Sequence, residues 1–382
     1  MHDALTDVDA EAAGRWRGVR RVLAVRLDNL GDLLMTTPAL AAMHESVPQL
    51  QLVLLTSPAG AALAGSLPFV NEVVVFDAPW IKAGDAALTG APLGQSESTL
   101  VQRLRASACD AAVVFTVCTQ SALPAALIAR MAGIPRRLAF SRENPYGLLT
   151  DWAHEIDHVG DGMRHEVERH LALVARVGWR ATDTRLRLVP DAAAHADAAQ
   201  ALRAAGVTAG APYFVVHPGA SAASRRWPAD RFGAAAQAIA RHTGATAVFT
   251  GDVGEHGLIT QAQQAMGGAS VSLVGRLGVA ALAVLIRDAT MLLANNTGPA
   301  HIAAAMGTPV VVLYAQTNPQ HTPWRVRSRV LYQDVPCRHC LKSVCPMGHH
   351  DCLLKVQPDT VVDAALALLE GDGARLEAGM QA

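Results

Sequence analysis

Short apolar runs along the chain are separated by longer stretches rich in Ala and Leu, with Gly, Pro and charged residues between them. Apolar runs bounded by turn residues are typical of buried strands, and the longer stretches are typical of helices. The alternation predicts an α/β chain with helices on both faces of a parallel sheet. In the first half we expect strands at residues 21–26, 52–56, 72–76, 111–116 and 137–140, and a helix at 33–45.

The same alternation restarts after a linker around residues 208–212. Strands are expected there at residues 213–217, 245–250, 271–273, 291–294 and 310–314, and helices at 228–242, 255–266, 279–288 and 299–306. Single cores stop growing near about 250–300 residues, so a chain of this length suits two domains. We expect a disordered leader at 1–19, Rossmann-like domains at 20–207 and 208–358, and a helix with a tail at 359–382. Two doubly wound domains in tandem predict a central cleft that both sheets face with their carboxyl ends.

Composition narrows the class of protein. The 382 residues are 51% hydrophobic and carry a net charge of -1, which argues against nucleic acid or an anionic membrane as a general electrostatic partner. The first twenty residues lack the apolar stretch of a secretory signal, and no uncharged apolar run reaches the length of about 18 residues that suggests a membrane span. The sequence predicts a cytoplasmic, soluble protein whose anion sites are local.

The first candidate for chemistry is a polar loop at residues 26–32, between the first strand and its helix. Asp32 can act there as a general base that takes a proton from an attacking hydroxyl. Asp is also among the best helix-capping residues, so a purely structural role stays open. The loop lacks the G-x-G-x-x-G spacing of dinucleotide-binding folds, which weakens an NAD or FAD interpretation.

The second candidate follows the first strand of the second domain. His217 and Gly219 lie in a strand-to-helix loop, and Gly219 permits close approach of the backbone to a ligand. Arg225 or Arg226 can offer directed donors to a diphosphate, although a solvated Arg pair is an equally ordinary interpretation.

The third candidate is a tight turn that opens a helix, with the sequence Asn-Thr-Gly-Pro at residues 296–299. Thr297 or Gly298 can be the N-cap with Pro299 in the first turn, which leaves free amides and the positive end of the helix dipole for an anionic group. His301, one turn further, can contact the same ligand or be a structural residue of the helix.

Four of the six cysteines crowd into residues 337–352, which we call the cysteine loop. Their spacing is Cys337-x2-Cys340-x4-Cys345-x6-Cys352, and only the first pair has the spacing of a metal knuckle. A structural zinc or iron ion, free thiols and disulfides are all compatible with this pattern, with disulfides disfavoured in a reducing compartment.

Together these segments resemble the ADP-heptose:lipopolysaccharide heptosyltransferases of glycosyltransferase family nine. The resemblance covers about residues 20–365 and is carried by RLDNLGDLLMTTPAL, HPGASAASRRWPADRF, FTGDVGEHG, ANNTGPAHIAAAMGTPVVVLY and CRHCLKSVCPMGHHDCL. It implies a GT-B fold of two Rossmann-like domains, an acceptor held by the first domain and an ADP-sugar, such as ADP-heptose, held by the second.

The resemblance also implies residue roles. Asp32 becomes the catalytic base, and the rest of its loop, Asp28, Asn29 and Gly31, is expected to contact a glycolipid or glycan acceptor. The donor would be held by the residues of the second domain with matching positions: His217, Gly219, Arg225, Glu255, Asn296, Thr297, Gly298, Pro299 and His301. It implies inverting transfer that requires no cofactor, and an enzyme that associates peripherally with the inner face of the cytoplasmic membrane.

One departure from the family pattern is Asn296, where many members carry Asp. The change removes a negative charge, so the donor sugar can differ from heptose. Similar cysteines bind iron in the branch that glycosylates autotransporter proteins, which makes a protein acceptor an alternative. Two further alternatives keep the fold: a non-catalytic nucleotide-sugar-binding protein and a sugar epimerase.

Overall fold

The computed structural model describes residues 7–81 and 93–370 and divides into two compact units, Met1–Val189 (unit 1) and Pro190–Ala382 (unit 2). The boundary lies earlier in the chain than the expected one after residue 207. Helix α7 (Ala192–Ala204) accounts for the difference, because its Ala194 and Ala198 pack with Ala281 and Val284 of α10 (Val279–Asp288) in unit 2.

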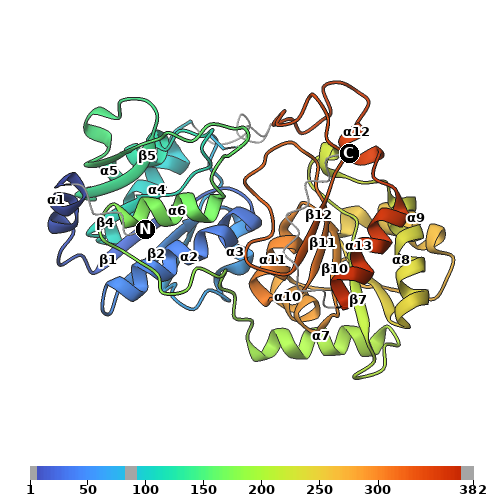
Figure 1. The fold of residues 1–382 in the computed structure, drawn as a ribbon. Helices are drawn as coiled ribbons and strands as arrows, with labels where there is room; N and C mark the ends of the chain where they lie inside the picture. Colours follow the sequence, from blue (N-terminus) through green and yellow to red (C-terminus); the bar gives the residue numbers. More distant parts are fainter. Residues whose placement is uncertain (1–6, 82–92, 371–382) are drawn as a thin grey trace. The chain divides into compact units, whose positions relative to one another are not determined.

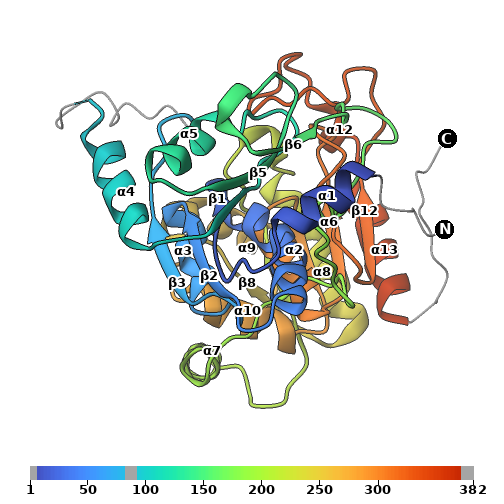
Figure 2. The same cartoon turned by 90° about the vertical axis from the view of Figure 1, so that its left-hand side faces the viewer.

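Unit 1 contains a parallel six-stranded sheet in the order β3-β2-β1-β4-β5-β6 among the described residues. Its strands are β1 (Arg21–Arg26), β2 (Gln51–Thr56), β3 (Glu72–Val75), β4 (Ala111–Val114), β5 (Arg136–Ser141) and β6 (Asp151–His154). Its helices include α2 (Leu30–Ser46), α3 (Pro58–Ala64), α4 (Gln95–Ala106), α5 (Leu123–Met131), η2 (Tyr146–Leu148) and α6 (Glu166–Ala175). Figure 2 shows α4 and α5 on one side of the strands and α2 with α6 on the other, as the apolar strands require.

The beginning of the chain corrects one expectation. Residues 1–19 are not a disordered leader throughout, because α1 spans Asp7–Arg15 and Trp16 beyond it is 3% exposed. The Trp16 ring meets that of Trp179 edge to face, with centroids 5.2 Å apart. Burial of an aromatic side chain supplies the apolar contact that orders this segment. Residues 1–6 and 371–382, which belong to the expected leader and tail, lie outside the described part of the chain.

Unit 2 repeats the strand order of unit 1. Its parallel sheet reads β12-β11-β10-β7-β8-β9, so β7 and β10 take the places of β1 and β4. The strands are β7 (Tyr213–His217), β8 (Thr246–Phe249), β9 (Ser270–Ser272), β10 (Leu292–Asn295), β11 (Val310–Leu313) and β12 (Ser328–Leu331). Helical segments include η3 (Ala223–Arg225), α8 (Ala229–Thr243), η4 (Val253–Glu255), α9 (His256–Met266), α11 (Gly298–Met306), α12 (Asp351–Leu354) and α13 (Pro358–Glu370).

The core of unit 2 is built around aromatic side chains on one face of the sheet. Trp227 and Phe232, which belongs to α8, are fully buried with ring centroids 5.0 Å apart. Helices α8, α9 and α13 lie together in unit 2 (Figure 1). Helices α10 and α11 pack together and α10 packs on α7. The expected two-domain α/β fold is confirmed. In such sheets the ligand site lies where the strand order reverses, here between β1 and β4 and between β7 and β10.

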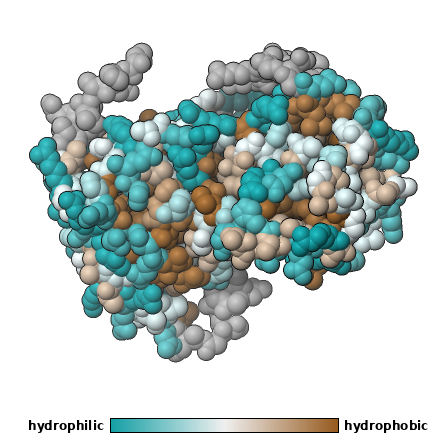
Figure 3. Space-filling model, turned by 90° about the horizontal axis from the view of Figure 1, so that it is seen from below, coloured by the Kyte–Doolittle hydropathy of each residue, from teal (hydrophilic) through white to brown (hydrophobic). Residues whose placement is uncertain are grey.

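The surface carries hydrophilic and hydrophobic residues interspersed in the view of Figure 3. None of the helices in the described residues combines the length and apolar character needed to cross a lipid bilayer.

Candidate active site

The loop after β1 is ordered by a reciprocal cap. Helix α2 begins at Leu30 with Asn29 as its N-cap, and the backbone amide of Asn29 donates to Asp32 Oδ2 at 3.0 Å. Asp32 is thus the third residue of the helix and not its N-cap. Its other carboxylate oxygen, Oδ1, lies 3.4 Å from Nη2 of Arg26. The two roles predicted for Asp32, helix capping and a carboxylate held for chemistry, are compatible in this geometry.

Arg26 is the centre of a buried charge cluster. Its side chain is 1% exposed, and it reaches Asp28 Oδ2 through Nε at 3.0 Å and Glu166 Oε1 through Nη1 at 3.4 Å. Burial alone would lower the pKa of Arg26, but the carboxylates of Asp28, Asp32 and Glu166 outweigh it and raise the pKa. One fixed cation therefore serves three carboxylates, one of which is Asp32.

Two of these carboxylates carry different pKa shifts. Burial raises the pKa of Asp28, and Arg26 only partly offsets this effect. Burial also opposes ionisation of Glu166, but His170, Arg26 and Arg169 outweigh it and lower the pKa of Glu166. Glu166 is therefore the firmly ionised partner of Arg26.

The three predicted acceptor residues of this loop differ in their surroundings. Asp28 is buried, pairs with Arg26 and accepts a hydrogen bond from Gln120 Nε2 at 2.6 Å. Gly31 is buried in the first turn of α2, whereas Asn29 is exposed. The structure places Asp28 in the support of Arg26, and acceptor contact by this loop stays a prediction.

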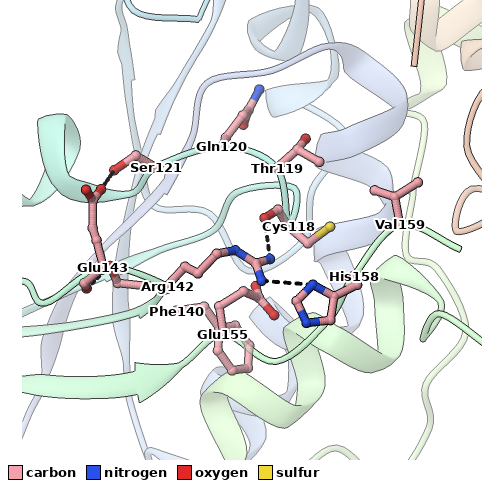
Figure 4. Close-up of a pocket in the computed structure, with 11 residues that line it drawn as sticks. Cys118, Thr119, Gln120, Ser121, Phe140, Arg142, Glu143, Glu155, His158 and Val159 are labelled. Carbon is pink, nitrogen blue, oxygen red and sulfur yellow. Dashed lines mark hydrogen bonds between the residues drawn. The ribbon is translucent and has the colours of Figure 1, made fainter. Parts of the chain in front are cut away.

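A cavity of about 560 Å³ opens at the carboxyl ends of β4, β5 and β6 in unit 1 (Figure 4). Gln120, which bonds Asp28, is one of its lining residues. Arg142 is held there by the carbonyl oxygens of Asp157 at 2.7 Å and Cys118 at 3.3 Å, with His158 Nδ1 at 3.2 Å from Nη1. Arg142 pairs with no carboxylate of the described residues, so its positive charge is available in the cavity.

In unit 2, Glu255 is enclosed by two glycines. A Cβ atom on Gly219 would lie 1.9 Å from Glu255 Oε1, and one on Gly251 would lie 2.9 Å from Oε2. Glu255 Oε2 accepts from the amide of Asp252 at 3.1 Å. Burial raises the pKa of Glu255. Only glycine fits at position 219 against this carboxylate, which explains the Gly in this loop.

His217, the last residue of β7, lies beside this carboxylate. Its Nδ1 is 3.1 Å from Thr250 Oγ1, and its Nε2 is 4.0 Å from Glu255 Oε2. Burial lowers the pKa of His217 to about 4, so the ring is neutral near pH 7. A neutral imidazole next to a carboxylate can form a hydrogen bond with a ligand, but it carries no positive charge to bind a phosphate.

The turn after β10 is held from behind by Asn295. Its Oδ1 accepts from the amide of Trp227 at 3.0 Å, and its Nδ2 donates to the carbonyl of Pro218 at 2.7 Å. Asn295 is fully buried, so it fixes the loop after β7 and the loop after β10 to each other. The sequence predicts nothing about this residue, although a buried Asn usually has such partners.

Helix α11 begins at Gly298, with Thr297 as an N-cap whose side chain makes no capping hydrogen bond. Pro299 in the first turn lacks an amide hydrogen in any case. Asn296 is 3% exposed, and its Nδ2 has no hydrogen-bond partner among the described residues. His301 is buried. The amide of Ala300 donates to the carbonyl of Thr297 at 3.0 Å, which leaves that of Gly298 in the first turn. The Gly298 amide and the buried Nδ2 of Asn296 form an arrangement suited to an anion.

Arg225 is the cation predicted for the anion site of unit 2. It ends the short helix η3 and lies near Tyr314, the residue that follows β11. Its guanidinium forms no ion pair with a carboxylate of the described residues. Arg226 instead donates from Nε to the carbonyl of Ala220 at 2.6 Å, so Arg225 is the one of the pair left for a ligand.

Comparison with known proteins identifies the family. The model of glycosyltransferase family 9 (heptosyltransferase) matches residues 98–350, which is more than half of the chain. The chain belongs to glycosyltransferase family 9.

Relatives agree with this family. Lipopolysaccharide heptosyltransferase 2 of Salmonella typhimurium is 24% identical over 92% of this chain and 99% of its own length. Lipooligosaccharide heptosyltransferase 2 of Campylobacter jejuni is 25% identical over 41% of this chain, and the match spans 50% of that protein.

Solved structures show the same fold. The family 9 glycosyl transferase of Veillonella parvula superimposes with a TM-score of 0.77 at 20% identity, over 92% of this chain and 97% of that one. An E. coli heptosyltransferase with ADP-2-deoxy-2-fluoro heptose gives a TM-score of 0.65 at 18% identity, over 90% of this chain and 98% of that one. The predicted glycosyltransferase class and family are thereby confirmed.

The cysteine loop of this glycosyltransferase does not have the predicted metal arrangement. Among the described residues no group of three or more His, Cys, Asp or Glu side chains could hold a metal ion, and all the cysteines are free thiols. Of the four predicted ligands Cys337, Cys340, Cys345 and Cys352, the first has its Sγ 3.7 Å from Nε2 of His349. Because the described residues contain no group that could hold a metal ion, the zinc or iron interpretation is unsupported.

The sequence interpretation also missed residues that support the base. Glu166 and Arg169 are buried with Arg26, and Gln120 connects Asp28 to the cavity. Arg26 itself carried a signal: it ends an otherwise apolar strand that was expected to be buried, and a buried Arg requires carboxylate partners.

Proposed function

We propose that this glycosyltransferase transfers heptose, or a closely related sugar, from an ADP-sugar to a lipopolysaccharide core or another glycan acceptor, with inversion and without a cofactor. The observation that carries the proposal is a pair of half-sites, one at the carboxyl ends of the strands of each sheet. One holds a carboxylate against a buried Arg, and the other offers amides and an unpaired Arg to an anion. The ligand in the E. coli relative, ADP-2-deoxy-2-fluoro heptose, supports the choice of donor.

In the proposed reaction the acceptor hydroxyl oxygen attacks the anomeric carbon while the bond from that carbon to the diphosphate oxygen breaks. Asp32 takes the hydroxyl proton, and the electron pair of the broken bond leaves with ADP. The Gly298 amide at the start of α11, Asn296 Nδ2 and the guanidinium of Arg225 receive the added negative charge. Preorganised donors aimed at developing charge are the strongest general contribution to such a step.

We assign the ribose of the donor to the loops after β7 and β8. Glu255, held between Gly219 and Gly251, has its carboxylate placed to accept from ribose hydroxyls, and His217 lies beside it. The raised pKa of Glu255 reflects burial, and two hydroxyl donors would replace the water that burial removes. At position 296 the sugar nucleotide should present a hydrogen-bond acceptor, because Asn296 Nδ2 is a hydrogen-bond donor without a partner among the described residues.

We assign the acceptor to the cavity lined by Gln120, Arg142 and His158. Asp28, which Gln120 bonds, forms an ion pair with Arg26, and Arg26 forms another with Asp32, so ion pairs connect the cavity to the proposed base within unit 1. The unpaired charge of Arg142 suits an acidic sugar or a phosphate on the acceptor. A glycolipid acceptor would place the enzyme at the inner face of the cytoplasmic membrane.

A donor and acceptor screen tests the proposal. The purified protein is melted with ADP-, GDP- and UDP-sugars, and transfer to lipopolysaccharide core oligosaccharide is followed by mass spectrometry. We expect ADP-heptose to raise the melting temperature by about 5–10 °C at about 100 times its Kd, and the product to gain one heptose. Equal responses to all three nucleotide sugars would contradict a specific preference for an ADP-sugar. Binding without transfer to any glycan or protein acceptor would favour a non-catalytic binding protein.

A further inference from the structure

The cysteine loop is bonded to the residue directly before Arg225. Ser224 is 3% exposed, its amide donates to the carbonyl of Ser343 at 3.0 Å, and its Oγ donates to the carbonyl of Lys342 at 2.6 Å. The carbonyl of Ser224 lies 2.7 Å from His350 Nε2. A carbonyl oxygen only accepts, so Nε2 of His350 carries the proton. All three polar groups of Ser224 are therefore engaged by the cysteine loop.

The same loop has a second attachment, on the segment after β11. The amide of His339 donates to the carbonyl of Gln316 at 2.6 Å, and the amide of Leu341 donates to that of Thr317 at 2.9 Å. In the sheet β11 and β7 lie on either side of β10. The cysteine loop thus connects the two segments that flank the strand whose end carries the Asn296 turn (Figure 1).

The backbone of the loop is strained at its points of attachment. His339, Leu341 and His350 have φ angles of 60°, 54° and 55°, in the left-handed region that non-glycine residues rarely adopt. Each of these three residues makes one of the attaching hydrogen bonds. Strained conformations persist only where surrounding contacts determine them. The strain therefore indicates a loop shaped by its attachment to this half-site.

We propose that the cysteine loop is a positioning element for the nucleoside diphosphate, with His350 and Ser224 as positioning residues that act through Arg225. This rests on the proposed role of Arg225 at the diphosphate. The Arg225 side chain has no carboxylate partner among the described residues to fix it, so the place of its guanidinium depends on its backbone. The three bonds on Ser224 hold that backbone from the adjacent residue.

The test is a double-mutant cycle on ADP affinity, measured by calorimetry on the full chain. The single variants are Arg225→Ala and His350→Asn, and the third is their combination. Asn tolerates the left-handed conformation of His350 but is too short to replace Nε2, so the variant removes the hydrogen bond without adding strain. We expect the Kd for ADP to rise about 10- to 100-fold in Arg225→Ala and about 3- to 10-fold in His350→Asn.

The combination decides the matter. If His350 acts through Arg225, the double variant binds ADP as Arg225→Ala does, within about twofold. Effects that multiply, or a His350→Asn variant with the wild-type Kd, would overturn the positioning role while leaving the diphosphate assignment intact. An unchanged Kd in Arg225→Ala would instead overturn the proposed role of Arg225, and the positioning role with it.

Two further variants separate positioning from general damage. His349→Asn alters the neighbouring His, which lies 2.9 Å from the amide of Asp351 and does not bond Ser224. We expect it to bind ADP as the wild type does. Ser224→Ala removes the hydrogen bond from Ser224 Oγ to the carbonyl of Lys342. It should raise the Kd for ADP about threefold and leave the melting temperature unchanged. Loss of affinity in His349→Asn equal to that in His350→Asn would show that any change in the loop suffices, and would overturn the specific role of His350.

Discussion

The two units share one strand order but equip the same sheet edge in opposite ways. In unit 1 the strand end at β1 is filled with acidic and basic side chains, since Arg26 contacts Asp28, Asp32 and Glu166. In unit 2 the strand end at β10 is filled with neutral groups, the amide side chains of two Asn residues and the uncapped first turn of α11.

The difference between the units follows from whether the negative charge belongs to the protein, as in unit 1, or to the proposed ligand, as in unit 2. The proposed base of unit 1 is itself a carboxylate, so unit 1 supplies the compensating cation from within the protein. A diphosphate arrives charged, so unit 2 keeps donors unpaired and leaves Arg225 without a carboxylate among the described residues. Each of the variants below removes one side of this contrast.

The largest effect is expected from Asp32→Asn. The amide keeps the size of the side chain and the approach to Arg26, but it cannot take a proton. We expect kcat for heptose transfer to fall about 10²- to 10⁴-fold while the Kd for ADP changes less than about twofold. Steady-state transfer assays and calorimetry check the two values. Transfer at more than a tenth of the wild-type rate would show that another group accepts the proton.

The contrast also separates what the sequence could predict from what it could not. Strands β1, β7 and β10 were predictable because continuous apolar runs mark strands buried on both faces. Strands β6 and β12 were missed because they lie at the sheet edges, where Asp151–His154 alternates buried with exposed residues and Ser328–Leu331 is only half-buried.

The same limit applies to the sites. The turn at Asn296–Pro299 is local, so its residues carry its signal together. The charge cluster in unit 1 joins Arg26 to Glu166, which are 140 residues apart in sequence, and no periodicity links such positions. Fold topology brings them together, and the sequence pattern alone could only indicate that Arg26 needed a partner.

The next effect is on stability. Arg26→Met should destabilise unit 1 by about 3–5 kcal/mol, because it leaves three carboxylates without their shared cation in a buried setting. Urea unfolding followed by circular dichroism measures the loss. The matched control is Arg185→Met, which breaks the ion pair of the exposed Arg185 with Asp183 and should leave the free energy of unfolding nearly unchanged. Similar losses in the two variants would contradict the view that unit 1 depends on its buried charges.

Unit 2 should respond to pH through a neutral group. Burial lowers the pKa of His217 to about 4, whereas an unfolded chain has a His pKa of about 6.5. Between about pH 4 and about pH 6.5 the unfolded chain binds a proton at His217 that the folded chain does not. The stability that this group contributes is therefore complete above the pKa of the unfolded chain and falls as the pH decreases. The loss should reach about 2 kcal/mol by about pH 5.

His217→Gln removes this titration while keeping a polar side chain beside Thr250. The measurement is the free energy of unfolding of both proteins at about pH 7 and about pH 5. We expect the difference between the two pH values to be smaller in the variant by about 2 kcal/mol. The same pH dependence in both proteins would mean that His217 is not the group responsible.

The smallest effect is expected from Gly219→Ala. The new Cβ would lie 1.9 Å from Glu255 Oε1, so the carboxylate must move away from the place proposed for the ribose hydroxyls. Loss of one or two hydrogen bonds should raise the Kd for ADP about fivefold to tenfold. Gly257→Ala is the matched control, because nothing lies within 4 Å of its new Cβ and α9 gains up to about 1 kcal/mol from the better helix former. Weakened ADP binding in Gly219→Ala alone would mean that unit 2 holds the donor only while the Glu255 carboxylate stays between Gly219 and Gly251. Equal affinities in the two variants would remove Glu255 from the donor site and leave the α11 turn and Arg225 to bind ADP.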